Sequence, residues 1–181
     1  MSASPVPQRL AATHRLFFAL WPDLRVRAEL ARAFGAVAHA AGEPVPAENL
    51  HVTLEFLGAV PATRIGELAT VGASVALPDA ELRFDSLEWW RHAAALVARA
   101  AAPPPALLEV QAELRRELGA RGFRVDARGF RPHVTLARRV TAEPALASLA
   151  DVRVAVRELA LLESTSSPRG VRYVPLASWS R

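Results

Sequence analysis

The feature that most constrains this chain is a repeated tetrapeptide. His51-Val52-Thr53-Leu54 recurs letter for letter as His133-Val134-Thr135-Leu136, and the residues around each copy predict a β-strand. In a strand, side chains at i and i+2 share one face, and those at i+1 and i+3 share the other. The valine and leucine of each copy can therefore enter a core while the histidine and threonine project into a cleft. Two such strands predict two lobes that face one cleft with the same polar side chains.

A single His-x-Thr in a strand is usually only part of a polar face, but two identical copies favour a functional interpretation. Imidazole has an ordinary pKa of about 6.5, so one ring can act as a base while the other acts as an acid. Across a phosphodiester, two imidazoles can take a proton from the attacking group and deliver one to the leaving oxygen. Two threonine hydroxyls can donate hydrogen bonds to non-bridging phosphate oxygens. Such a set needs no metal ion, and we expect no cofactor.

The hydrophobic pattern along the rest of the chain predicts alternating strands and helices. We expect strands at 15–21, 49–57, 81–90, 93–98, 131–138, 152–163 and 171–179, and helices at 24–42, 61–75 and 107–119. Helices interleaved with short strands and hairpins indicate an α+β domain in which helices back antiparallel sheets. We expect residues 1–181 to form a single domain of two pseudo-symmetric lobes, with 1–14 as a flexible N-terminus.

Composition removes several classes of chemistry. The chain has no cysteine and no lysine, so all 22 basic positions are arginine. Disulfides, thiolate nucleophiles, cysteine zinc sites, Schiff bases and lysyl-nucleotide intermediates are therefore excluded. The net charge of +4 modestly favours a phosphate ligand, although a solvated basic surface explains it equally well.

The longest run without Asp, Glu or Arg spans 68–78, shorter than the ~20 residues of a membrane-spanning helix. The apolar run near the N-terminus is too short for a signal peptide. We therefore expect a cytoplasmic protein that has no membrane contact.

The tandem motif resembles the 2H phosphoesterase superfamily, which is named for two His-x-Thr-x motifs. The flanks are similar to its LigT-like branch, the RNA 2′,3′-cyclic phosphodiesterases that are also called 2′-5′ RNA ligases. The similar segments are NLHVTLEFLG at 49–58, FRPHVTLAR at 130–138, RLFFAL at 15–20, and LLES at 161–164 with Tyr173, Leu176 and Trp179. The resemblance covers nearly the whole chain from Arg15 onward and is poorest at 87–98.

The resemblance implies a bilobal, pseudo-twofold α+β fold in which two antiparallel sheets face a central cleft and helices pack outside. It implies metal-independent hydrolysis of RNA or nucleotide 2′,3′-cyclic phosphate ends to 2′-phosphates, with weak ATP-independent 2′-5′ RNA ligation. The expected partners are such RNA ends or nucleotides, without an obligate protein partner, so we expect a monomer.

The resemblance also implies roles for individual residues. By motif position, His51 is the proton donor and His133 the proton acceptor, while Thr53, Thr135 and Arg138 bind phosphate and Phe56 stacks on a base. Phe56 and Arg138 lie five positions after their histidines, where strict alternation puts them on the opposite strand face. They reach the cleft only through a bulge, a strand end or a strong twist. Strict alternation puts Arg139 on the face of the histidines, whereas the resemblance supports Arg138. We prefer Arg138.

For other residues, and for the function, the sequence leaves alternatives. We expect His14, His39 and His92 to be surface or capping residues, and at most one of Trp89 and Trp90 to stack on a base. A metal site at the two motif histidines lacks a second strong ligand. The alternative functions are a non-catalytic RNA-end-binding module, and a 2H phosphodiesterase that acts on another cyclic phosphate or on a 2′-5′ oligonucleotide.

Overall fold

The structure is a computed structural model that describes residues 12–144, 152–168 and 170–181. Of the predicted flexible N-terminus, residues 1–11 lie outside the described residues, whereas Thr13 and His14 already belong to the first strand. The strands are β1 (Thr13–Leu20), β2 (Glu43–Pro44), β3 (Val52–Pro61), β4 (Glu81–Phe84), β5 (Ser86–Trp90), β6 (Ala95–Arg99), β7 (His133–Arg138), β8 (Val152–Ala155), β9 (Glu158–Ser167) and β10 (Gly170–Ser180). The helices are α1 (Leu24–Ala41), α2 (Ile65–Ser74) and α3 (Pro105–Ala120).

The main sheet has two halves that meet at the motif strands. Its order is β10-β9-β1-β3-β7-β6-β5, with β2 also paired to β7, and every pairing is antiparallel. β1 and β3 pair along their whole length, but β3 and β7 share only the pair Val52–Val134. The halves β10-β9-β1-β3 and β7-β6-β5 are therefore joined at one narrow point. The predicted α+β fold with antiparallel sheets is confirmed.

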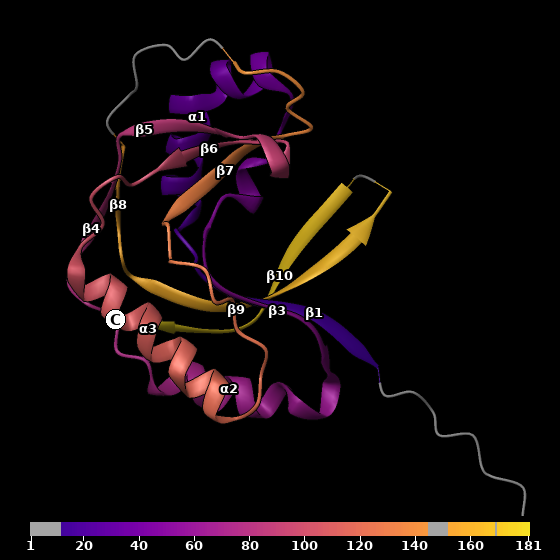
Figure 1. Ribbon diagram of the computed structural model, residues 1–181, viewed down its shortest axis with the longest axis vertical. Helices are drawn as coiled ribbons and strands as arrows, with labels where there is room; N and C mark the ends of the chain where they lie inside the picture. The colour runs from indigo at the N-terminus through magenta and orange to yellow at the C-terminus, as the bar shows by residue number, and fades with distance from the viewer. Residues whose placement is uncertain (1–11, 145–151, 169) are drawn as a thin grey trace, which may run out of the picture.

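The helices cover the two halves from opposite ends of the molecule (Figure 1). α1 packs against β2 and β7, whereas α2 and α3 lie side by side and contact β9, β10 and β3. Asp23 caps the N-terminus of α1, because its side chain accepts a hydrogen bond from the backbone N–H of Val26 at 2.9 Å. The helix turns Leu30, Phe34 and Ala38 into the core. Across the described ranges, no helix combines the length and apolar character that a membrane crossing requires.

Several predicted boundaries were wrong because strands change partner along their length. The predicted strand 81–90 is two strands, since β4 leaves the main sheet to pair with β8 while β5 pairs with β6. The predicted strand 152–163 divides into β8 and β9 for the same reason. β3 runs through Gly58, which has a positive φ of 71°, to Pro61, so α2 begins only at Ile65.

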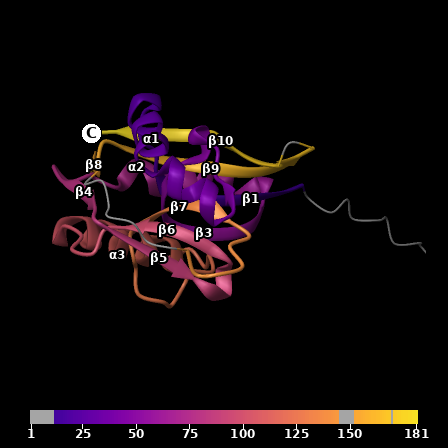
Figure 2. The same ribbon diagram turned by 90° about the horizontal axis from the view of Figure 1, so that it is seen from above.

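The C-terminal hairpin is longer than the sequence predicted. The loop expected at 164–170 is largely strand, because pairing between β9 and β10 continues to Ser167 and Gly170. β1 pairs with β9 only as far as Glu163, so the end of the hairpin extends past the sheet as an arm. Figures 1 and 2 show this arm projecting away from the helices.

Candidate active site

The narrow junction of the two half-sheets gathers the four motif side chains. Val52 pairs with Val134, and continuing this antiparallel register places His51 opposite Thr135 and Thr53 opposite His133. The two valines are fully buried, whereas all four polar side chains are only partly buried. Each histidine thus lies across from the threonine of the other motif, on the face opposite the valines.

Each motif histidine is held in the same way by the residue two positions before it. Nδ1 of His51 lies 2.7 Å from the backbone oxygen of Asn49, and Nδ1 of His133 lies 2.7 Å from that of Arg131. A carbonyl oxygen only accepts, so Nδ1 carries the hydrogen and Nε2 of each neutral ring is left with its lone pair. Nε2 of His51 accepts a hydrogen bond from the Thr53 hydroxyl at 3.0 Å. Both rings can therefore exchange protons through Nε2.

The His51 ring is surrounded by aromatic side chains. Its ring centroid is 5.1 Å from that of Phe17 and 4.9 Å from that of Tyr173, which meets it edge-on. Burial lowers the pKa of His51 to about 4, and the positive charges of Arg138 and Arg27 act in the same direction. The free protein therefore holds this histidine neutral near pH 7.

His133 has a different neighbourhood. The ring centroid of Trp90 lies 4.3 Å from its own, and Glu88 lies close by. Burial lowers the pKa of His133, and Arg131 acts in the same direction, but the Glu88 carboxylate opposes them. Glu88 accepts hydrogen bonds from the Trp90 indole at 2.9 Å and from Arg131 at 2.6 Å, and it pairs with Arg99. Trp90 thus belongs to the site.

The neighbouring tryptophan turns the other way, as alternation along a strand requires. Trp89 packs against the core, and its indole donates to the backbone oxygen of Val140 at 3.3 Å. Of the two adjacent tryptophans, only Trp90 contacts a motif histidine in the structure.

A bulge lies three residues after each histidine and explains how Phe56 and Arg138 come to lie on the face of the histidines. In β3, Thr53 pairs with Ala19 but Glu55 pairs with Phe18, so Leu54 is the extra residue. In β7, Thr135 pairs with Val97 but Ala137 pairs with Leu96, so Leu136 is extra. Each bulge residue and the residue after it are both buried, and the next residue, which is the fifth after the histidine, is exposed. Phe56 and Arg138 consequently return to the face that carries the histidines.

The structure brings Arg138, and not Arg139, to the two histidines. The positive charge of Arg138 lowers the pKa of both His51 and His133. Arg139 lies beyond the end of β7 with a φ of 55°, and its guanidinium forms an ion pair with Glu43 at 2.5 Å. Of the two arginines, Arg138 is therefore the candidate for a phosphate contact.

Sequence reasoning missed Arg27, which lies beneath the His51 half of the site. Arg27 is 7 % exposed, and its guanidinium carbon lies 4.2 Å from the centroid of the Trp21 ring. One of its amino groups donates a hydrogen bond to the backbone oxygen of Glu48 at 2.6 Å. Nε of Arg27 is buried without a hydrogen-bond partner among the described residues. The apolar spacing of α1 places position 27 on the same buried face as Leu30, Phe34 and Ala38, so an arginine there is unusual, but no pattern in the sequence links it to His51.

The sequence marks Asn49 only as part of a motif flank, but in the structure its side chain fixes the C-terminal hairpin to the site. Its Nδ2 donates to the backbone oxygen of Val171 at 2.8 Å, and its Oδ1 accepts from the backbone N–H of Tyr173 at 3.3 Å. The same residue holds His51 through its carbonyl. Asn49 thus couples the Tyr173 ring to the His51 ring.

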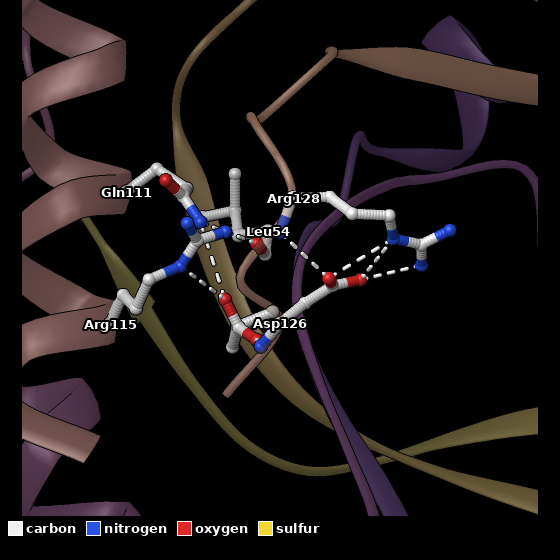
Figure 3. A network of polar contacts seen from close by, with 6 residues as sticks. Leu54, Gln111, Arg115, Asp126 and Arg128 are labelled. Carbon is white, nitrogen blue, oxygen red and sulfur yellow. Dashed lines mark hydrogen bonds and ion pairs between the residues drawn. The ribbon is translucent and has the colours of Figure 1, made fainter. Parts of the chain in front are cut away.

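A buried carboxylate on β3 contacts α3 and the segment before β7, from which Gln111, Arg115 and Asp126 are labelled in Figure 3. Glu55 is 2 % exposed and accepts hydrogen bonds from Gln111 at 3.3 Å, Arg115 at 3.2 Å and the backbone N–H of Asp126 at 2.7 Å. These contacts tie α3 and the segment before β7 to β3. Because Glu55 follows the Leu54 bulge directly, they also hold the backbone that turns Phe56 towards the site.

The remaining histidines lie outside this cluster. His14 is bonded to Glu163 at 2.7 Å, and His39 and His92 are exposed. Within 12–144, 152–168 and 170–181, no three or more histidine, aspartate or glutamate side chains gather in a way that could hold a metal ion.

Comparison with known proteins gives consistent matches over almost the whole chain. The sequence model of the 2′-5′ RNA ligase superfamily matches residues 21–168. The RNA 2′,3′-cyclic phosphodiesterase of Escherichia coli K12 is 30% identical over 178 residues, which cover 94% of this chain and 98% of the relative. The protein of the same name from Thermus thermophilus is 30% identical over 177 residues, with coverages of 92% and 89%. The crystal structure of E. coli LigT complexed with 3′-AMP superposes with a TM-score of 0.85 at 29% identity, covering 93% of this chain and 98% of that one.

Proposed function

The chain belongs to the 2′-5′ RNA ligase superfamily, and we propose that it hydrolyses 2′,3′-cyclic phosphate ends of RNA or nucleotides to 2′-phosphates. The observation that carries this proposal is the pair of motif histidines, each held through Nδ1 and each left with Nε2 for proton transfer. A protein that only binds an RNA end has no need of two proton carriers. Both motifs come from one chain, so the proposed site is complete in a monomer.

The proposed reaction moves one proton at each histidine. Nε2 of His133 accepts a proton from water as the water oxygen attacks phosphorus. The bond from phosphorus to the 3′-oxygen breaks, and Nε2–H of His51 delivers a proton to that oxygen. The phosphate stays on the 2′-oxygen. Solvent then restores the starting protonation of both rings.

The phosphate oxygens are to be held by Thr53, Thr135 and Arg138. In the free protein the Thr53 hydroxyl donates to Nε2 of neutral His51. Protonation of His51 removes that lone pair, so the hydroxyl is released to donate to a phosphate oxygen. Arg138 supplies positive charge where negative charge develops. Phe56, 43% exposed on the same face, is the proposed base-stacking residue.

Because the pKa of His51 is low in the free protein, the substrate has a second role, which is to favour protonation of this histidine. His51 must be protonated to act as the donor, yet burial and the nearby arginines hold its pKa near 4. A bound phosphodiester anion offsets those positive charges and raises the pKa of His51. Substrate binding thus prepares the donor.

Joining of RNA ends is the same reaction with a 5′-hydroxyl in place of water: the 5′-oxygen attacks phosphorus, the bond to the 3′-oxygen breaks, and a 2′-5′ linkage forms. The cyclic phosphate is then the activated group, and ATP has no part. The absence of lysine from the sequence agrees with this, because ATP-dependent RNA ligases carry the nucleotide on a lysine. A covalent adenylylated form of the protein would contradict it.

The direct test is turnover of adenosine 2′,3′-cyclic monophosphate with the product assigned by phosphorus NMR. We expect adenosine 2′-phosphate, with a rate that a chelator leaves unchanged. Absence of turnover would favour the RNA-end-binding alternative, and faster cleavage of ADP-ribose 1″,2″-cyclic phosphate or a 2′-5′ oligonucleotide would move the activity to that substrate. A loss in chelator that zinc or manganese reverses would show that a metal takes part.

A further inference from the structure

The site face continues along β1, away from the motif strands. Ala19 pairs with Thr53, Phe17 with Phe56 and Arg15 with Ala59. These three β1 residues share one face, since they are two apart, and each step of two residues covers about 7 Å. The row therefore leads from the motif, past the aromatic pair, to Arg15.

The side chains of this row change from buried to exposed along it. Phe17 is buried, and its ring contacts that of His51. Phe56 is 43% exposed, and the guanidinium carbon of exposed Arg15 lies 4.7 Å from its ring centroid. Stacking on a ring fixes the plane of a guanidinium and leaves its N–H groups free at the edge. The row thus ends in oriented, accessible N–H groups that can donate hydrogen bonds to a phosphate.

Arg15 differs from other arginines around the site in its pairing. Arg99 and Arg131 pair with Glu88, and Arg139 pairs with Glu43. Within the described part of the chain, Arg15 has the Phe56 ring as its partner and no carboxylate. Its charge is therefore available to a ligand.

We propose that Arg15 binds the phosphate that links the terminal nucleotide to the preceding one, so that the site is built for the end of an RNA chain rather than for a free cyclic mononucleotide. This inference rests on the proposed function. With the cyclic phosphate at the two histidines and the terminal base on Phe56, the chain leaves along β1, where the next group it presents is a phosphate.

The test compares a cyclic mononucleotide with a dinucleotide that ends in the same cyclic phosphate. Arg15→Met should lower kcat/KM for the dinucleotide roughly tenfold, the loss of one charge-assisted phosphate contact, and leave the mononucleotide unchanged. Arg32→Met, which removes an exposed arginine from α1, is the matched control and should change neither. A dinucleotide whose internal phosphate is an uncharged methylphosphonate should reproduce the loss in the wild type and suffer no further loss in Arg15→Met.

Equal losses on the two substrates, no loss on either, or additive effects of Arg15→Met and the methylphosphonate would overturn the inference. If neither substrate is hydrolysed, the proposed function fails, and binding of a labelled tetra-adenylate by fluorescence anisotropy decides the role of Arg15 separately. Weaker binding in Arg15→Met, matched by one internal methylphosphonate, supports the inference. Equal affinities of wild type and variant contradict it.

Discussion

The two motif histidines share their backbone surroundings but not their electrostatic ones. Each donates from Nδ1 to a carbonyl two residues earlier, and each is followed by a bulge at the third residue. Arg138 lowers the pKa of both rings. Near His51 the cation Arg27 adds to this effect, whereas beside His133 the Glu88 carboxylate opposes the cation Arg131. The repeat sets the geometry of both rings, and the residues outside it make the rings different.

This difference bears directly on the division of roles. The Glu88 carboxylate opposes part of the fall in the pKa of His133, which helps a base that must take a proton from water. A buried histidine among cations releases its proton readily, which suits an acid that must give one to a poor leaving group. The cations also favour the phosphate anion that the donor needs beside it.

The largest expected effect comes from removing either ring. His51→Ala and His133→Ala should each lower kcat on a 2′,3′-cyclic nucleotide by roughly 10²–10⁴-fold, the usual contribution of a positioned acid or base. Steady-state kinetics measures this. His39→Ala, at an exposed histidine of α1, is the control and should match the wild type. Loss from one motif alone would contradict the paired use of the two rings.

The pH dependence sharpens the comparison. In the free protein the pKa of His51 is lowered to about 4 and that of His133 is also lowered, and the alkaline limb of a bell-shaped profile lies at the higher of the two. The alkaline limb of kcat/KM should therefore lie below the ordinary histidine pKa of 6.5. Bound phosphate raises the pKa of His51, so the alkaline limb of kcat should lie at higher pH. Rates at subsaturating and saturating substrate give the two profiles. Coincident alkaline limbs would show that substrate does not prepare the donor.

A smaller and more selective effect is expected from the buried cation. Arg27→Met removes a positive charge from the surroundings of His51 and should raise the pKa of His51 while leaving that of His133 unchanged. Histidine resonances followed by NMR against pH measure both rings, and Arg32→Met serves as the control. A common shift of the two rings, or none, would show that Arg27 does not distinguish them.

Much of the fold could be predicted because its patterns are local. The helix 24–42 follows from apolar spacing and the Asp23 cap, and α1 agrees with it almost residue for residue. The division of 81–90 into β4 and β5 could not be predicted, because it depends on β8, which comes much later in the chain. Strand partners are a property of the tertiary structure and leave no mark on local alternation.

The site shows the same division. The repeat was sufficient to predict that His51, Thr53, His133 and Thr135 share a face. The bulges that turn Phe56 and Arg138 towards that face were stated only as a requirement, because an extra residue in one strand is defined against its neighbour. Arg27 was missed, since its contact with the site runs through the rings and backbone of other elements.

The measurement that tests the division of roles most directly uses two substrates that differ in leaving group. A ribose hydroxyl needs a proton to leave, whereas p-nitrophenolate does not. We predict that His51→Ala severely damages hydrolysis of the cyclic nucleotide but damages hydrolysis of a p-nitrophenyl phosphodiester much less, while His133→Ala damages both because water must still be activated. Equal losses for both variants on both substrates would contradict separate acid and base roles, and the reverse pattern would exchange them.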